Sequence, residues 1–286
     1  MRNNSTNLEV NKKPTRLKKM LTVVCVAFLI YILSGILITI FQEKLIFYPQ
    51  PISKEMISHI DSKHPEAQPI SITMKDSTEV NGWLVRGREN SQRLCIYFGG
   101  NGDEASSMIE QAARFPDWSF VLMNYRGYGQ SNGSPNEKHL FSDAVQIYDY
   151  FSTRQEAESV PIVVMGRSIG SGVAVYLAQN RPVAGIILST PYDSLLSVTK
   201  EKIPIYPIDF MLRNRFDSLG RAASINKPVL FLTAEKDRLI HPAHAETLAG
   251  KWGGKVYMVE ITGEDHNSIV ESEEYWESID VFLDGF

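Results

Sequence analysis

Residues 160–179 read VPIVVMGRSIGSGVAVYLAQ: a short apolar run, then G-x-S-x-G, then a helical pattern. The run 160–165 predicts a buried strand, and residues 171–179 predict a helix. G-x-S-x-G between a strand and a helix is typical of a sharp turn that holds its central serine in a strained conformation. Because the flanking glycines leave room for the crossing backbone, the turn presents the Ser168 hydroxyl at the carboxyl edge of the sheet. We therefore expect Ser168 to be a nucleophile and the Ile169 N–H to bind an oxyanion.

The chain around this motif alternates between short apolar runs and helical patterns. Eight runs predict strands, at residues 70–74, 80–85, 94–98, 120–124, 161–165, 183–188, 229–232 and 256–261. Helical patterns cover residues 105–114, 138–153, 170–179, 243–251 and 268–283. The first two runs resemble a hairpin and the later ones alternate with helices. This order predicts an α/β fold with an eight-stranded, mostly parallel sheet and helices on both faces.

Residues 191–223 interrupt this alternation with Pro204, Pro207 and several apolar side chains. We expect them to form a small cap that shapes one wall of a cleft. An ordinary helical connection without a substrate role is the alternative.

An uncharged apolar stretch runs from residue 21 to residue 41. A helix of that length just crosses a hydrocarbon layer of about 30 Å, and residues 42–45 offer no small-residue cleavage site for a signal peptidase. The preceding segment is basic, with a lone Glu9 against Arg2, Lys12, Lys13, Arg16, Lys18 and Lys19. The positive-inside rule then predicts a signal anchor with a cytoplasmic N-terminus and an extracytoplasmic catalytic domain.

These observations divide the chain into four parts. They are a basic cytoplasmic tail (1–20), a transmembrane helix (21–41), a juxtamembrane connection (42–69) and a catalytic domain (70–286) that contains the cap. A length of 286 residues with 43% apolar residues suits one sizeable core plus this appendage.

The composition also excludes several classes of partner. The net charge of −4 argues against nucleic acid. The two cysteines, Cys25 and Cys95, belong to no disulfide or zinc pattern, and the scattered histidines form no H-E-x-x-H motif. We expect no metal and no cofactor, and the sequence predicts no particular oligomeric state.

A glycine-rich segment, Phe98-Gly99-Gly100-Asn101-Gly102, follows the third predicted strand. Only small residues let a backbone amide approach a substrate closely, so this loop is expected to supply the second oxyanion donor. We predict that the donor is the N–H of Asn101, with Gly100 as the next candidate. A glycine turn without function is the alternative.

The general base is expected among the histidines that follow the serine. His266 lies after the last predicted strand and directly before the final helix, where a loop would carry it over Ser168. His241 and His244 begin a helix one strand earlier, and we expect them to be solvated or capping residues.

The acid that orients this base should follow the strand at 229–232. Asp237 is best placed there, and Glu235 is expected to be a surface residue. Asp193, which follows the preceding strand, is the rival.

Together these pieces resemble the α/β-hydrolase superfamily from about residue 70 to the end. LIFYP at 45–49, NYRGYGQS at 124–131 and DRLIHP at 237–242 look like the single-span branch related to acyl-protein thioesterases and serine aminopeptidase-like hydrolases. In that resemblance Tyr125, Arg126 and Gly127 are structural. Relatives commonly carry histidine at the position of Gly99, as in H-G-N, and this sequence departs from that pattern.

The leading hypothesis is hydrolysis of an ester or thioester through an acyl-enzyme on Ser168, with Asp237 and His266 completing a triad. The resemblance, the anchor and the apolar cap imply a small-molecule or lipid-like acyl substrate. One alternative is a serine peptidase for short peptides, with Asp209 or Asp217 holding the substrate amine. Another is a membrane-tethered scaffold without enzymatic activity.

Overall fold

The computed structural model describes residues 16–88, 93–153 and 160–286. It divides into two compact units, Met1–Gln42 and Glu43–Phe286. Arg2, Lys12 and Lys13 of the predicted basic tail lie outside the described residues.

The helix α1 (Arg16–Ile46) contains the predicted span. Its 31 residues are long and apolar enough to cross a membrane, and most of its large apolar side chains are exposed. At a rise of about 1.5 Å per residue, the 21 predicted residues measure roughly 30 Å, the thickness of a hydrocarbon core.

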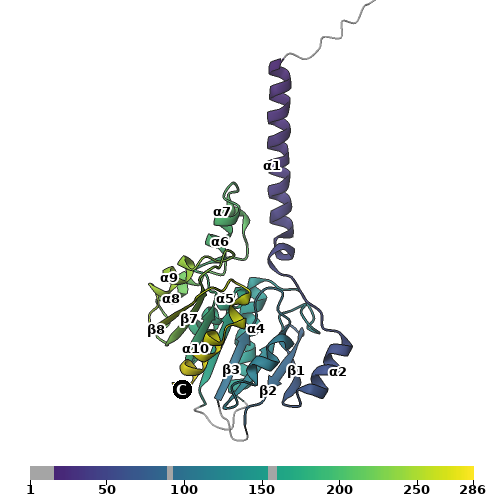
Figure 1. The fold of residues 1–286 in the computed structure, drawn as a ribbon. Coiled ribbons are helices and arrows are strands. Elements are labelled where there is room, and N and C mark those ends of the chain that lie inside the picture. The colour runs from purple at the N-terminus through teal and green to yellow at the C-terminus, as the bar shows by residue number, and fades with distance from the viewer. Residues whose placement is uncertain (1–15, 89–92, 154–159) are drawn as a thin grey trace, which may run out of the picture. The chain divides into compact units, whose positions relative to one another are not determined.

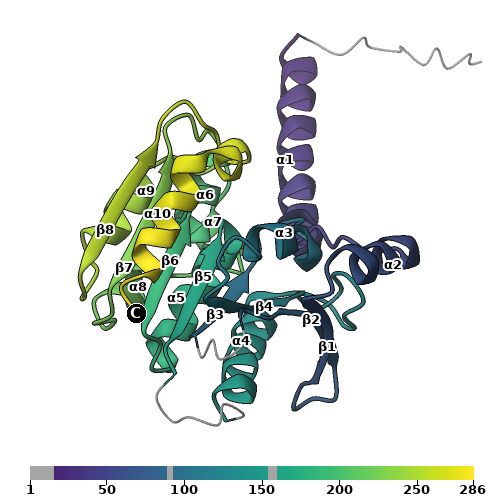
Figure 2. The same ribbon diagram turned by 60° about the horizontal axis from the view of Figure 1, so that its bottom comes forward.

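The second unit is built on one sheet, which within the described residues has eight strands in the order β1-β2-β4-β3-β5-β6-β7-β8 (Figures 1 and 2). Their bounds are β1 (Ala67–Thr73), β2 (Glu79–Val85), β3 (Arg93–Phe98), β4 (Trp118–Met123), β5 (Ile162–Arg167), β6 (Gly185–Ser189), β7 (Val229–Ala234) and β8 (Val256–Ile261). The strand β2 is antiparallel to both β1 and β4, whereas all strands from β4 to β8 in the sheet order are parallel. The predicted eight-stranded, mostly parallel sheet is therefore confirmed.

Helices cover both faces of this sheet. On one face lie α4 (Glu137–Ser152), α5 (Ile169–Asn180), α8 (Leu219–Ala222) and α9 (Ala243–Ala249). On the other lie α2 (Lys54–Lys63), η1 (Ala105–Met108), α3 (Ile109–Ala112) and α10 (Glu273–Leu283), the last preceded by η2 (Ser268–Glu271) (Figure 2). The central strand β3 is buried on both faces: Leu94, Ile96 and Phe98 enter one core, and Cys95 and Tyr97 enter the other. This two-sided burial explains why the parallel strands read as continuous apolar runs.

The predicted helices are present, with boundaries shifted by a few residues. The amphipathic helix α2 was not predicted, because its ten residues form too short a periodic pattern. It begins at the N-cap Ser53, whose hydroxyl accepts the Met56 N–H at 3.1 Å.

The segment after α1 joins the second unit through its side chains. Phe47 is buried and packs against Phe216, with ring centroids 6.4 Å apart, whereas Tyr48 is exposed. The Tyr48 N–H donates to the side chain of Asn101 at 2.8 Å, so this segment reaches the glycine-rich loop after β3.

The irregular segment 191–223 forms α6 (Leu195–Lys202), α7 (Ile208–Met211) and α8. Ile208 on α7 is buried, whereas the side chains of Ile205 and Phe210 are 69% and 91% exposed. Proline at 204 and 207 keeps these helices short.

Candidate active site

The turn between β5 and α5 places Ser168 at the carboxyl edge of the sheet. Ser168 has φ 51° and ψ −119°, a strained conformation for a residue with a side chain. Its N–H donates to the carbonyl of Ser189 on the neighbouring strand at 2.9 Å. A Cβ atom at Gly166 would lie 2.3 Å from the Gly170 carbonyl oxygen, and one at Gly170 would lie 2.1 Å from the Phe98 carbonyl oxygen. The two glycines of the motif therefore permit the crossing that the turn requires.

Three side chains predicted from the sequence meet at this edge. The Ser168 Oγ lies 3.0 Å from Nε2 of His266, and Nδ1 of His266 lies 2.7 Å from Oδ2 of Asp237. The other carboxylate oxygen of Asp237 accepts the N–H groups of Leu239 and Ile240 at 2.9 and 2.8 Å. A carboxylate held as an acceptor on both oxygens receives the Nδ1 proton of the imidazole. Nε2 is then unprotonated and accepts the Ser168 hydroxyl.

The loop that carries His266 is tied to the loop that carries Asp237. Glu235 accepts the Gly263 N–H at 2.7 Å, and the Glu264 carbonyl accepts the Lys236 N–H at 2.8 Å. Ser168, Asp237 and His266 are 8%, 4% and 7% exposed. Their hydrogen bonds are thus shielded from water, which strengthens them.

The rival acid Asp193 is engaged elsewhere. Its Oδ1 lies 2.8 Å from Nδ1 of His244 on α9, and it also accepts the hydroxyl of Ser197. His244 is buried, so the expectation that it is solvated is wrong, whereas His241 is exposed and accepts the Ala243 N–H at 3.2 Å. The pKa of His244 is raised, mainly by its hydrogen bond to Asp193. Burial alone would raise the pKa of Asp193, but its hydrogen bonds to His244 and Ser197 leave it lowered.

The glycine loop, residues 99–103, follows β3 beside Ser168. The Gly100 N–H donates to Oδ2 of Asp103 at 2.7 Å and is therefore occupied. Oδ1 of Asn101 accepts the Tyr48 N–H at 2.8 Å and the Tyr128 hydroxyl at 3.2 Å, which fixes the side chain of Asn101. Within the described residues the Asn101 N–H donates no hydrogen bond.

Sequence reasoning missed Arg167, which occupies the position between Gly166 and Ser168 in the G-x-S-x-G motif. Its Nη1 donates to Oδ2 of Asp103 at 2.8 Å, and its Nη2 donates to the carbonyl of His266 at 3.2 Å. Burial by itself lowers the pKa of Arg167, but the attraction of Asp103 leaves that pKa above its ordinary value. The available signal was a charged residue at the end of an otherwise apolar strand.

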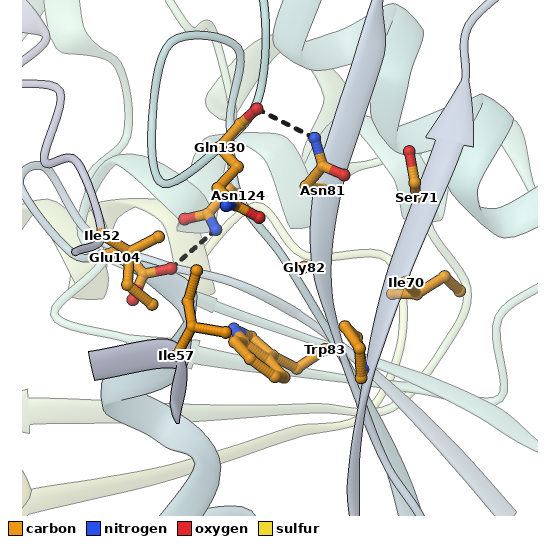
Figure 3. Close-up of a pocket in the computed structure, with 11 residues that line it drawn as sticks. Ile52, Ile57, Ile70, Ser71, Asn81, Gly82, Trp83, Glu104, Asn124 and Gln130 are labelled. Carbon is orange, nitrogen blue, oxygen red and sulfur yellow. Dashed lines mark hydrogen bonds between the residues drawn. The ribbon is translucent and has the colours of Figure 1, made fainter. Parts of the chain in front are cut away.

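A separate hollow lies beside β1 and β2 (Figure 3). Asn124 donates to Glu104 at 2.8 Å, and the Asn81 side chain donates to the Gln130 carbonyl at 3.0 Å, as the dashed lines show. These polar groups bind one another, and neither Ser168 nor His266 lines the hollow. It is therefore distinct from the candidate active site. In the described ranges no group of three or more histidine, cysteine or acidic residues is arranged to hold a metal.

Comparisons with known proteins support the α/β-hydrolase fold. The family model described as serine aminopeptidase S33 matches residues 89–198, which include the serine turn. The chain is 25% identical to the α/β-hydrolase domain-containing protein WAV2 of Arabidopsis thaliana, over 77% of this chain and 79% of that protein. It is 27% identical to an uncharacterized membrane protein of Saccharomyces cerevisiae, over 79% and 84% respectively.

Among solved structures, an esterase of Pyrococcus furiosus superposes with a TM-score of 0.68 at 18% identity. The match covers 84% of this chain and 97% of the esterase, so the similarity extends over the whole fold. The chain therefore has the α/β-hydrolase fold, and these similarities support a hydrolase.

Proposed function

We propose that the protein is a membrane-anchored serine hydrolase that cleaves an ester or thioester through an acyl-enzyme on Ser168. The observation that carries this proposal is the chain of hydrogen bonds from Ser168 through His266 to Asp237, at a strained strand-to-helix turn. Nucleophile, base and orienting acid are already within the distances that proton transfer requires.

In the acylation step, the Ser168 oxygen attacks the substrate carbonyl while Nε2 of His266 takes the hydroxyl proton. The carbonyl oxygen becomes an oxyanion, which we assign to the N–H groups of Ile169 and Asn101. Ile169 opens α5, where backbone N–H groups lack intrahelical acceptors and the helix dipole favours negative charge. His266 then returns the proton to the departing alcohol or thiol, and the acyl group stays on Ser168.

In the deacylation step, water takes the place of the leaving group. His266 removes a proton from the water, the resulting hydroxide attacks the acyl carbonyl, and the proton passes to the Ser168 oxygen. A carboxylic acid leaves, and the enzyme is restored. Asp237 stabilises the positive charge of His266 in both steps.

Turnover of short p-nitrophenyl esters by the full-length protein in detergent tests this proposal. Ser168→Ala is expected to lower kcat by about 10³-fold or more, because the nucleophile and its covalent step are removed. Ser142→Ala, at an exposed position on α4, is the matched control and is expected to keep most of the activity. Equal turnover by wild type and Ser168→Ala would reject the catalytic assignment.

The membrane anchor rests on α1, whose length and composition suit one span. The exposed side chains Ile205 and Phe210 give the cap an apolar surface, which suits an apolar acyl substrate better than a charged one. A screen of p-nitrophenyl esters from acetate to palmitate should therefore show a higher kcat/KM for longer chains.

The matching family model supports a peptidase as the second candidate, since it describes serine aminopeptidases. Such an enzyme needs an acidic group free to bind the substrate amine. Asp209, however, pairs with Lys200 at 2.7 Å, and Asp217 accepts the Gly220 N–H at 2.9 Å. Both expected anchors are engaged, so the ester or thioester substrate is favoured.

A further inference from the structure

The glycine loop is held against the serine turn by one ion pair. A single oxygen, Oδ2 of Asp103, accepts both the Gly100 N–H at 2.7 Å and the Arg167 Nη1 group at 2.8 Å. The second Nη group of Arg167 reaches the carbonyl of His266 at 3.2 Å. One guanidinium therefore connects three segments that come from β3, β5 and β8.

The Asp103–Arg167 pair is close in the sequence to the groups that are proposed to react. Arg167 directly precedes Ser168, and Gly100, whose N–H the pair fixes, directly precedes Asn101. The Asp103 and Arg167 side chains are 23% and 13% exposed, so water screens their attraction less than at an open surface.

Close packing of the loop on the pair requires glycine at position 100. A Cβ atom there would lie 2.9 Å from Oδ2 of Asp103 and 3.4 Å from Nη1 of Arg167. The adjacent Gly99 carries no side chain that could fix the loop, and its carbonyl accepts the Tyr125 hydroxyl at 2.7 Å. The pair and Tyr125 thus give the loop the rigidity that its glycines lack.

We propose that Asp103 and Arg167 are positioning residues that align the Asn101 N–H with the oxyanion on Ser168 and hold the backbone of His266. They touch no reacting atom and act through the loop. The inference rests on the proposed serine hydrolase mechanism, in which Asn101 supplies an oxyanion donor. A misplaced donor costs most in the transition state, where the negative charge develops.

The test compares Asp103→Asn, Arg167→Met, Arg167→Lys and the double variant Asp103→Asn/Arg167→Met in the full-length protein. Asp103→Asn and Arg167→Met are each expected to lower kcat for p-nitrophenyl butyrate by about 10- to 100-fold, with KM changed by about twofold at most. Inhibition by a trifluoromethyl ketone, whose adduct with Ser168 carries an oxyanion, should weaken in parallel with kcat/KM.

Two further readouts separate positioning from general stability. The double variant should lose less kcat than the product of the two single effects, because the two residues share one of their contacts. Arg167→Lys should recover part of kcat, since lysine can reach Asp103 but lacks the fork that also reaches His266. The control variants are Arg181→Met and Asp149→Asn. They break a similar ion pair, with bonds of 2.5 and 2.7 Å, between the C-cap of α5 and α4. Both control variants should keep the wild-type kcat.

Unchanged kcat and unchanged ketone inhibition in folded Asp103→Asn and Arg167→Met would overturn the positioning role. So would a loss of activity that only follows the loss of folded protein in thermal unfolding. If Arg167→Met does not fold, the positioning role is tested with Asp103→Asn and Arg167→Lys. Activity in wild type that does not depend on Ser168 would reject the proposed function itself, a different result from insensitivity to the pair.

Discussion

At the scale of residues, three side chains from three loops form one hydrogen-bonded path. Ser168 is fixed by a turn with positive φ, and His266 and Asp237 by loops that bind each other. Parallel strands bring these loops together because all their carboxyl ends lie at one edge of the sheet. The reactive geometry is therefore a consequence of topology together with a few backbone hydrogen bonds.

The identity of the acid gives the first residue-scale prediction. Asp237→Asn should lower kcat by about 10⁴-fold, because an amide in place of the carboxylate favours the wrong tautomer of His266. Asp193→Asn should change kcat by about threefold at most, since Asp193 binds His244 instead. Steady-state measurement of kcat for both variants tests which aspartate is the acid. A larger fall in kcat for Asp193→Asn than for Asp237→Asn would assign the role of acid to Asp193.

Much of this path could be predicted from the sequence, because each side chain follows a recognisable strand. The strained serine turn, the last-strand histidine and the aspartate one strand earlier are local patterns with fixed order. The Asp103–Arg167 pair could not be predicted, since its partners are 64 residues apart and no local periodicity links them. The same reason explains why His244 was expected in solvent: its partner Asp193 is 51 residues away.

At the scale of elements, the His244–Asp193 contact fastens the start of the cap to α9. Asp193 precedes Ser194, the N-cap of α6, and Glu201 near the end of α6 lies 3.3 Å from Nε2 of His244. One histidine on α9 therefore faces two carboxylates at opposite ends of a cap helix. We therefore expect the charge of His244 to affect how firmly α6 is held.

This contact predicts a pH dependence of stability. The folded pKa of His244 lies above its ordinary 6.5, so its contribution is complete below pH 6.5 and is lost as pH rises through the folded value. The folded pKa of Asp193 lies below its ordinary 3.8, so its contribution is present above pH 3.8 and is lost as pH falls through the folded value. The contact is therefore strongest between these two ordinary values.

Thermal unfolding of the full-length protein from pH 5 to pH 9 measures this effect. The wild-type midpoint should fall as pH rises above 6.5, and His244→Gln should reduce that fall. His241→Gln changes an exposed histidine of the same segment and should keep the wild-type profile. A His244→Gln profile parallel to the wild type would show that the contact contributes no pH-dependent stability.

The elements of the sheet were predictable, whereas the cap was predictable only as an interruption. The strands from β2 to β7 are buried on one or both faces, and burial of that kind is visible in composition. The edge strands β1 and β8 are mostly exposed. The cap helices α7 and α8 have four residues each, too few for a helical period to emerge. Their arrangement depends on tertiary contacts such as the buried Ile208.

At the scale of the whole molecule, the chain joins an apolar helix of 31 residues to a unit with the α/β-hydrolase fold. We expect the catalytic unit to be extracytoplasmic, because basic residues precede the predicted span. Protease added to intact spheroplasts should digest the unit Glu43–Phe286, and alkaline extraction should leave the intact chain in the membrane. Complete protection of that unit from external protease would reverse the predicted orientation.

The central claim is that Ser168 is an activated nucleophile, and a fluorophosphonate probe tests it most directly. The full-length wild type in detergent should be labelled once per chain, on the peptide that contains Ser168, and Ser168→Ala should not be labelled. Folded Ser142→Ala, which changes an exposed serine on α4, should be labelled like the wild type. A folded wild type that takes no label, or a label that persists in Ser168→Ala, would contradict the account.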